Sequence, residues 1–488
     1  MNKNITYGHN KSIKKNAVLN GIRNICNLIF PLITIPYVSR VLSVESMGKY
    51  NFSQSIVSYF LLIAALGIDK YAVREGTKYR DNKKQFSQFA SEVFTINIIS
   101  TILAYLLLVL YLLYSKKGQE YSNCILVFSI QIIFTTIGIE WLYSIYEDYQ
   151  YITIRSILFK AISLVLLFAF VRKPSDYMSY AAISVFAVVG SNFMNYIHAK
   201  KYCKLKLTFH FNANSAIKAI LIIFATNIAI QIYVNSDVTM LGYLKNDNVV
   251  GIYSLSSKIY MMIKNLLSAV LIVTIPRFSY YLNLGKLDDY NKLLLKLINT
   301  LSLLILPTMI LMLILSGNIV QVIGGNQYLQ SATSLKILCI ALVFSIFSMT
   351  FNQCILIPYR LEKIALYSSI ISALLNIGLN FVLIPIIAEN GAAITTVLAE
   401  LIMMLLNGWF CREKLKSVFH SKLFLNNIKT VIIGCMALAL VCYFTRSITG
   451  NPFLDLMISG ILSLLTYAAT QFLFGNIYIK KMMNNHTP

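Results

Sequence analysis

The sequence has 488 residues, of which 57% are hydrophobic and only 12% are charged. A soluble globular protein carries about 25% charged residues, so this composition leaves too little polar surface for a water-facing particle and excludes a soluble fold. The formal net charge of +23 comes from lysines and arginines in short clusters between apolar runs. That pattern is typical of the loops of membrane proteins and argues against nucleic-acid binding.

Fourteen apolar runs follow one another along the chain. About 20 apolar residues in a helix cross a hydrocarbon core about 30 Å thick. The runs lie near residues 17–41, 48–67, 87–114, 122–146, 150–171, 177–202, 215–244, 249–274, 291–317, 329–354, 362–385, 391–414, 426–447 and 453–478. We therefore expect an all-α, polytopic membrane protein of about 14 transmembrane helices.

The basic residues alternate between the two sets of loops. When the N-terminus is placed inside, the inner loops hold more than three times as many lysines and arginines as the outer loops. Because basic residues favour the cytoplasmic side, we expect both termini in the cytoplasm. The abundance of asparagine, isoleucine, lysine and tyrosine suggests an AT-rich bacterial genome, and hence a bacterial plasma membrane.

A short element recurs at an offset of 203 residues. Gly48-Lys-Tyr-Asn-Phe-Ser-Gln-Ser-Ile56 opens the second run, and Gly251-Ile-Tyr-Ser-Leu-Ser-Ser-Lys-Ile259 opens the eighth. Six runs separate the copies, so both halves enter the membrane in the same direction and form a parallel repeat with a site expected between them. We expect an N-lobe at 1–208, a C-lobe at 209–420 and two additional helices at 421–488.

Several charged residues fall deep inside the apolar runs. A charge near the bilayer centre costs at least about 2.5–3.5 kcal/mol, so one that persists faces a partner or a wet cavity. Asp237 and Lys258 are predicted at matching depths in the membrane on adjacent antiparallel helices, and so are Glu140 and Lys160. Each pair is either an ion pair that serves structure or one that takes part in function. The remaining deep charges are Arg23, Lys264 and Glu400.

The seventh run carries a polar stripe of Asn227, Gln231 and Asn235 along one helix face. The stripe predicts either hydrogen bonds between helices or, as we favour beside Asp237, the lining of a hydrated cavity. If the basic side chains of Arg23, Lys258 and Lys264 face that cavity, its ligand is anionic, and phosphate oxygens suit such cations.

Common catalytic and nucleotide motifs are missing from the sequence. There is no GxxxxGK, HExxH or GxSxG segment, and we expect no cofactor, no metal site and no enzymatic activity. Any energy that the protein uses must then come from an ion gradient, the membrane potential or consumption of a substrate.

Three stretches resemble a known family, the Wzx-type polysaccharide flippases of the multidrug/oligosaccharidyl-lipid/polysaccharide exporter superfamily. They are Glu140-Trp-Leu-Tyr143 with Glu147-Asp-Tyr149 and Ile154-Arg-Ser156; Gly324, Tyr328 and Ala332; and Asn376-Ile-Gly-Leu-Asn380 with Leu383-Ile-Pro385, Gly391-Ala-Ala-Ile394 and Glu400. The resemblance runs from about residue 10 to 415.

The resemblance implies two six-helix lobes, as in MATE-like transporters, around a cationic cavity. It also implies an undecaprenyl-diphosphate-linked oligosaccharide as cargo, flipped from the inner to the outer leaflet during surface polysaccharide biosynthesis. We expect capsule as the product, membrane lipids as surroundings, H+ or Na+ as coupling ion, and the polymerase and glycosyltransferases of the same pathway as partners.

Three other functions stay open at this point. The chain could flip another polyprenyl-linked precursor, for teichoic acid or peptidoglycan. A MATE-like drug or cation antiporter would favour an acidic cavity, whereas bases dominate here. A membrane polysaccharide polymerase would favour a large outer loop, and no predicted outer loop is much longer than a dozen residues.

Overall fold

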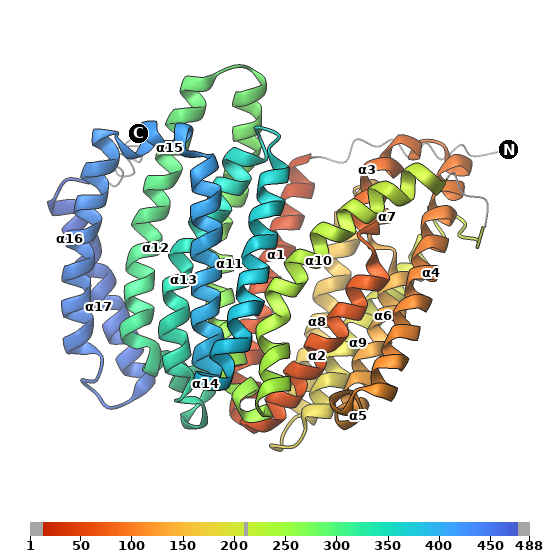
Figure 1. Ribbon diagram of the computed structural model, residues 1–488, viewed down its shortest axis with the longest axis horizontal. Helices are drawn as coiled ribbons and strands as arrows, with labels where there is room; N and C mark the ends of the chain where they lie inside the picture. The colour runs from red at the N-terminus through yellow and green to blue at the C-terminus, as the bar shows by residue number, and fades with distance from the viewer. Residues whose placement is uncertain (1–12, 209–212, 477–488) are drawn as a thin grey trace. The chain divides into compact units, whose positions relative to one another are not determined.

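The computed structural model describes residues 13–208 and 213–476, and neither range contains a β-strand. Twelve of the described helices are long and apolar enough to cross a membrane. One of them, the 49-residue α14 (Glu362–Phe410), holds two predicted spans joined at a break, and the 32-residue α10 (Ala213–Leu244) covers the seventh predicted span. The expected all-α fold of about fourteen transmembrane helices is confirmed (Figure 1).

The chain divides into two compact units, Met1–Tyr243 and Leu244–Pro488. In the first unit α2 packs on α4 and α6, α9 packs on α6 and α8, and α1 packs on α8. The helices of this unit are α1 (Ile13–Val41), α2 (Val44–Ala65), α3 (Ile68–Gly76), α4 (Lys83–Tyr114), α5 (Lys116–Glu120), α6 (Ser122–Gly138), α7 (Glu140–Ile145), α8 (Tyr149–Phe170), α9 (Tyr177–Ala199) and nearly all of α10.

In the second unit α13 is central and packs on α11, α12 and α14, while α16 packs on α17 and α12. The helices are α11 (Asp247–Asn283), α12 (Leu287–Gly324), α13 (Ser331–Phe351), the broken α14, α15 (Arg412–Phe419), α16 (Lys422–Thr445) and α17 (Pro452–Leu473). The division after Tyr243 assigns α10 to the first unit, whereas the expected C-lobe began at residue 209. The expected three-part division at 208 and 420 stays a prediction.

Polar residues set the starts of several helices. The Ser43 hydroxyl and the Asn246 carboxamide each accept a backbone N–H from the first turn of α2 and α11, which satisfies a donor that has no partner inside the helix. Pro452 takes the first position of α17 behind the cap Asn451, where its missing N–H costs nothing.

Left-handed residues end or interrupt helices at three places in the chain. Leu66 (φ 46°) and Gly67 (φ 73°) separate α2 from α3, Ile139 (φ 35°) separates α6 from α7, and Ala388 (φ 48°) breaks α14. A positive φ is unfavourable for residues other than glycine, so the surrounding packing must hold each of these breaks. The predicted span 122–146 is therefore two helices rather than one.

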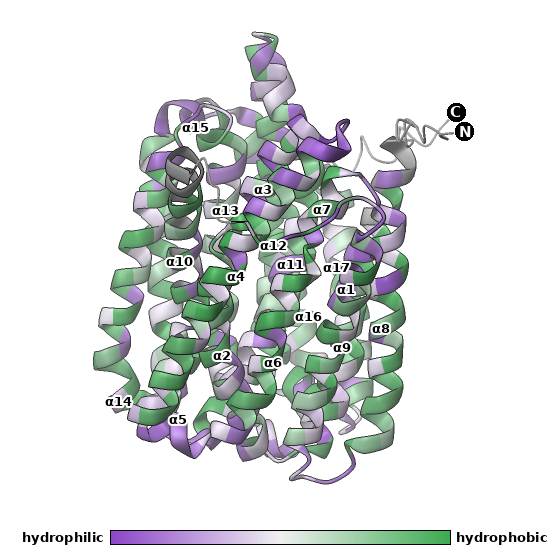
Figure 2. Cartoon of the chain, turned by 90° about the vertical axis from the view of Figure 1, so that its right-hand side faces the viewer, coloured by the Kyte–Doolittle hydropathy of each residue, from purple (hydrophilic) through white to green (hydrophobic). Residues whose placement is uncertain are grey.

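The pattern of burial is the reverse of that in a soluble protein, with many apolar side chains exposed and polar side chains buried. Leu113 of α4 is 62% exposed and Leu465 of α17 is 61% exposed, whereas Asn376 and Asn380 of α14 are fully buried. Figure 2 shows hydrophobic residues along the lengths of the helices and hydrophilic residues gathered toward their ends. Lipid tails solvate such apolar surfaces, and polar side chains inside then bond helix to helix.

Candidate functional site

In the first unit, Glu140 lies between two arginines. The break at Ile139 makes Glu140 the first residue of α7. Its carboxylate forms an ion pair with Arg23 of α1 and lies 3.8 Å from the Nη2 atom of Arg155 of α8. The Arg155 side chain is only 5% exposed and also donates to the Ser191 carbonyl at 3.1 Å. The deep charge Arg23 therefore has an acidic partner on a different helix.

The expected pair between Glu140 and Lys160 is wrong. The Lys160 ammonium donates instead to the carboxamide oxygen of Asn27 in α1. The predicted match in depth assumed that an unbroken helix led into the turn. Because α6 stops at Gly138 and the short α7 starts afresh, Glu140 comes level with Arg155, one and a half turns before Lys160 in α8.

The next acidic residues of the same stretch, Glu147 and Asp148, form contacts that join elements of the first unit. Glu147 has φ 52° and lies 3.3 Å from Arg80, and it accepts a hydrogen bond from Asn16 at 3.3 Å. Asp148 accepts a hydrogen bond of 2.5 Å from the Tyr202 hydroxyl. The sequence marks both carboxylates only as part of a resemblance, since Arg80, Asn16 and Tyr202 all lie more than 50 residues from the carboxylates they contact.

The polar stripe of α10 contacts other helices of the first unit. Asn235 donates to the Ser58 hydroxyl at 3.0 Å, and the carboxamide oxygen of Asn227 accepts from Lys70 at 3.4 Å. Gln231 is half-buried between them. These contacts match the alternative in which the stripe bonds helix to helix, and the cavity-lining role of Asn227, Gln231 and Asn235 stays a prediction.

In the second unit, Lys264 of α11 pairs with Glu400 of α14. The two charged atoms lie 2.7 Å apart, the Glu400 side chain is 1% exposed and the Lys264 side chain is 21% exposed. The Tyr260 hydroxyl donates to the same carboxylate oxygen at 3.4 Å, and the Lys264 ammonium lies 5.6 Å from the centre of the Tyr260 ring. Sequence reasoning named both charges but did not pair them, because 136 residues separate them.

Asp237 and Lys258 belong to different units, Asp237 to the first and Lys258 to the second. Asp237 of α10 is buried and Lys258 of α11 is partly exposed. Their pairing stays a prediction.

A cluster of amide and hydroxyl groups joins the two halves of α14. Thr395 donates to the carboxamide oxygen of Asn380 at 2.6 Å, and Asn380 donates to that of Asn376 at 3.2 Å. Further along, the Ser372 hydroxyl donates to the Ala399 carbonyl at 2.6 Å. All of these side chains are buried. The i, i+4 spacing of the two asparagines was the available signal, but only the break at Ala388 folds Thr395 back onto them.

No metal-binding group occurs in the described part of the chain, where three or more histidine, cysteine or acidic side chains nowhere come together. The charged groups are arranged instead as base–acid pairs that join helices within each unit. Such pairs, buried inside a polytopic helical membrane protein, are typical of transporters.

This chain belongs to the polysaccharide biosynthesis protein family, whose sequence pattern matches residues 13–282. The MatE pattern matches residues 223–382. Both matches lie inside the range over which the family resemblance was expected.

Two relatives cover most of the chain. A candidate O-antigen transporter of Escherichia coli (strain K12) is 24% identical over 408 residues, which are 82% of this chain and 97% of that protein. The capsular polysaccharide biosynthesis protein CapF of Staphylococcus aureus is 23% identical over 412 residues, which are 80% of this chain and 97% of that protein.

Solved structures show the same fold. The lipid II flippase MurJ in an inward closed conformation matches with a TM-score of 0.76 and 15% identity, over 96% of this chain and 99% of that one. An inward-facing multidrug resistance MATE transporter of the MOP superfamily matches with a TM-score of 0.60 and 13% identity, over 83% and 99%. The expected resemblance to Wzx-type flippases of this superfamily is confirmed in family and fold.

Proposed function

We propose that this protein flips an undecaprenyl-diphosphate-linked oligosaccharide from the cytoplasmic to the outer leaflet of the bacterial plasma membrane. The family match over residues 13–282 carries the proposal. The names of the two relatives, an O-antigen transporter and a capsular polysaccharide biosynthesis protein, support a surface polysaccharide as the product, and CapF favours capsule. The glycosyltransferases and polymerase of that pathway would then be its partners.

We assign the diphosphate to Arg23, Lys258 and Lys264. Guanidinium and ammonium groups are the natural partners of phosphate oxygens. Two of the three cations form an ion pair with a carboxylate in the structure, Arg23 with Glu140 and Lys264 with Glu400. A diphosphate that enters would replace these carboxylates, so the ion pairs keep the cations oriented and partly compensated until the cargo binds.

The displaced carboxylates also supply a coupling mechanism. A buried carboxylate that loses its cation is strongly destabilised unless it takes up a proton. Binding of the cargo to Lys264 therefore leaves the Glu400 carboxylate in need of another cation, and an H+ or Na+ ion from the coupling gradient would serve. Asp237, Asn227, Gln231, Asn235 and Lys160 are assigned to the hydrated lining of the same pathway.

The proposal is tested by Arg23→Gln and Lys258→Gln in a strain that lacks the native gene. Glutamine keeps a hydrogen-bonding side chain at each position, and Arg155 stays beside Glu140 in Arg23→Gln. The protein level should therefore stay normal while lipid-linked oligosaccharide accumulates in the inner leaflet and surface polysaccharide falls. Lys336→Gln is the matched control, because Lys336 lies on α13 as an exposed residue and should export normally. Normal export by both site variants would remove these residues from the site.

The same strains distinguish the alternative cargo. If the chain restores growth to a strain deprived of its peptidoglycan-precursor flippase, and leaves surface polysaccharide unchanged, the oligosaccharide cargo is wrong while the flippase mechanism stands. If it confers only drug resistance, both are wrong.

A further inference from the structure

A large groove lies within the second unit, apart from the charge pairs described above. It has a volume of about 940 Å³ and is bordered by α12, α13, the second half of α14, α15 and α16. Binding pockets for small molecules span about 300–1,000 Å³, so this groove is near the upper end of that range. Nothing in the proposed transport cycle uses it.

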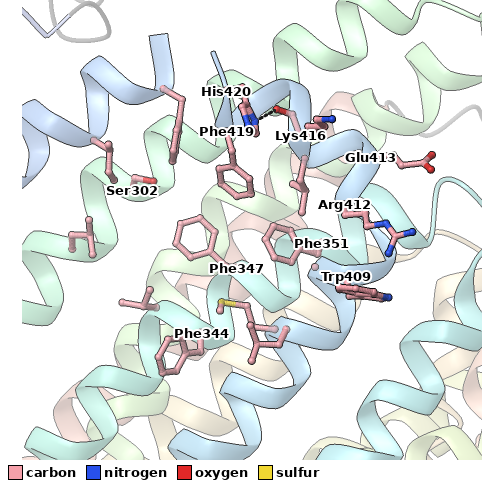
Figure 3. Close-up of a pocket in the computed structure, with 18 residues that line it drawn as sticks. Ser302, Phe344, Phe347, Phe351, Trp409, Arg412, Glu413, Lys416, Phe419 and His420 are labelled. Atoms are coloured by element: carbon pink, nitrogen blue, oxygen red, sulfur yellow. Dashed lines mark hydrogen bonds between the residues drawn. The ribbon is translucent and has the colours of Figure 1, made fainter. Parts of the chain in front are cut away.

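The walls of the groove are aromatic and apolar. Figure 3 shows the rings of Phe347, Phe351 and Phe419 gathered around one space, and Phe344 lines the groove further along. Trp409 borders the same space and is 65% exposed. A surface of this kind matches hydrocarbon chains rather than a sugar, whose hydroxyls would lose their hydrogen bonds.

The rim at one end of the groove is basic. It is formed by α15, a short amphipathic helix between two spans whose Leu415 is buried while Arg412 and Lys416 are exposed. The Arg412 guanidinium lies 4.7 Å from the centre of the Trp409 ring. The acidic residue of the same helix, Glu413, points away from the phenylalanine rings in Figure 3.

We infer that the groove holds a resident anionic diacyl phospholipid, with acyl chain against the phenylalanines and phosphate on Arg412 and Lys416. Basic pockets between transmembrane helices bind anionic headgroups, and each lysine or arginine near the surface contributes about a five-fold preference. An aromatic side chain at the same level suits the boundary between headgroup and tail. This inference does not depend on the cargo of the transporter.

Quenching of tryptophan fluorescence by brominated acyl chains tests the inference directly. The chain has 2 tryptophans, so Trp141→Phe leaves Trp409 as the only reporter. The protein is reconstituted into phosphatidylcholine vesicles that contain the same fraction of either brominated phosphatidylglycerol or brominated phosphatidylcholine, and each signal is divided by that in unbrominated lipid. The anionic lipid should quench Trp409 selectively.

Three variants distinguish binding of a headgroup at Arg412 and Lys416 from general contact between lipid and protein. Lys416→Gln should reduce the preference for phosphatidylglycerol about five-fold. Lys414→Gln removes the same charge from the same helix, but Lys414 lies 5.0 Å from the centre of the Tyr359 ring and does not border the groove, so it should retain the preference. Gly408→Leu places a side chain in the groove and should abolish selective quenching.

Four results would overturn the inference. Equal quenching by the two lipids would show that the groove does not select charge. Equal loss in the Lys416 and Lys414 variants would show a general surface effect, and unchanged selective quenching in Gly408→Leu would place the lipid elsewhere. Relief of quenching by a small amount of unbrominated undecaprenyl diphosphate would assign the groove to the cargo instead.

Discussion

At the scale of single residues, two of the deep carboxylates of this protein pair with basic side chains from helices that are far apart in the sequence. Glu140 contacts one arginine from α1 and one from α8, and Glu400 contacts a lysine from α11. Such pairs offset the cost of charge within the membrane, and each leaves one costly group behind when its partner is removed.

The pair Lys264–Glu400 predicts a specific pattern of stability. Lys264→Gln should cost about 3–5 kcal/mol, because it leaves the fully buried Glu400 carboxylate without its cation. The double variant Lys264→Gln with Glu400→Gln should recover a large part of that loss, since two neutral amides can bond to each other. Detergent-solubilised protein unfolded by heat or by denaturing detergent provides the measurement.

Lys336→Gln serves as the control for that series, because Lys336 is exposed on α13 and its loss should change the stability by no more than about 0.5 kcal/mol. If the single and double variants are equally unstable, the pair is not the source of the effect. Export should stay impaired in the stable double variant, since the cation assigned to the diphosphate is gone.

At the scale of elements, the break in α14 determines how its two halves pack. Gly391 follows the non-helical residues Ile387 and Ala388, and a Cβ atom added there would lie 2.6 Å from the carbonyl oxygen of Leu383. The absence of a side chain therefore lets the second half approach the backbone of the first, which brings Thr395 to Asn380.

This close approach predicts that Gly391→Ala destabilises the protein. Backbone must move to admit the methyl group, and overpacking of this kind costs about 1–3 kcal/mol. The matched change Gly378→Ala lies in the same helix where the added atom meets nothing within 4 Å. It should be neutral or stabilise by up to about 1 kcal/mol, because alanine favours helix over glycine. Equal melting temperatures for the two variants would contradict the packing argument.

At the scale of the whole molecule, the distribution of basic residues predicts the orientation of the chain. The Lys83 ammonium at the start of α4 donates to the Lys201 carbonyl at 3.3 Å, whereas α5 follows the other end of this 32-residue helix. Loops near Lys204 and Glu120 therefore lie at opposite ends of the first unit. The excess of positive charge predicts that the Lys204 end lies in the cytoplasm.

Cysteine labelling tests this orientation in intact cells. All 8 native cysteines are free thiols and 7 of them are buried, so they should react little with a water-soluble reagent, and the protein without an added cysteine serves as the control. A cysteine at Glu120 should react with an impermeant reagent from outside, and one at Lys204 should react only after the membrane is opened. Both positions are exposed. Labelling of Lys204→Cys in intact cells would reverse the topology.

The sequence alone predicted the class of fold, because span length and loop charge follow from the thickness and polarity of the bilayer. It also located the deep charges, since a charge within an apolar run is visible at once. Its error at Glu140 had a local cause: a left-handed isoleucine at position 139 carries no sequence signal, whereas a glycine there would have indicated a break.

What the sequence by itself determined about this protein is therefore the apolar spans, the charges that lie within them and, through its motifs, the family. Only the tertiary structure decided which charges meet, where α14 folds back and where an apolar groove acquires a basic rim. The physical reason is that hydropathy and charge act along one helix at a time. The partners of Glu140, Glu400 and Thr395 depend on helix packing and on breaks such as those at Ile139 and Ala388, which are stable only in the folded unit.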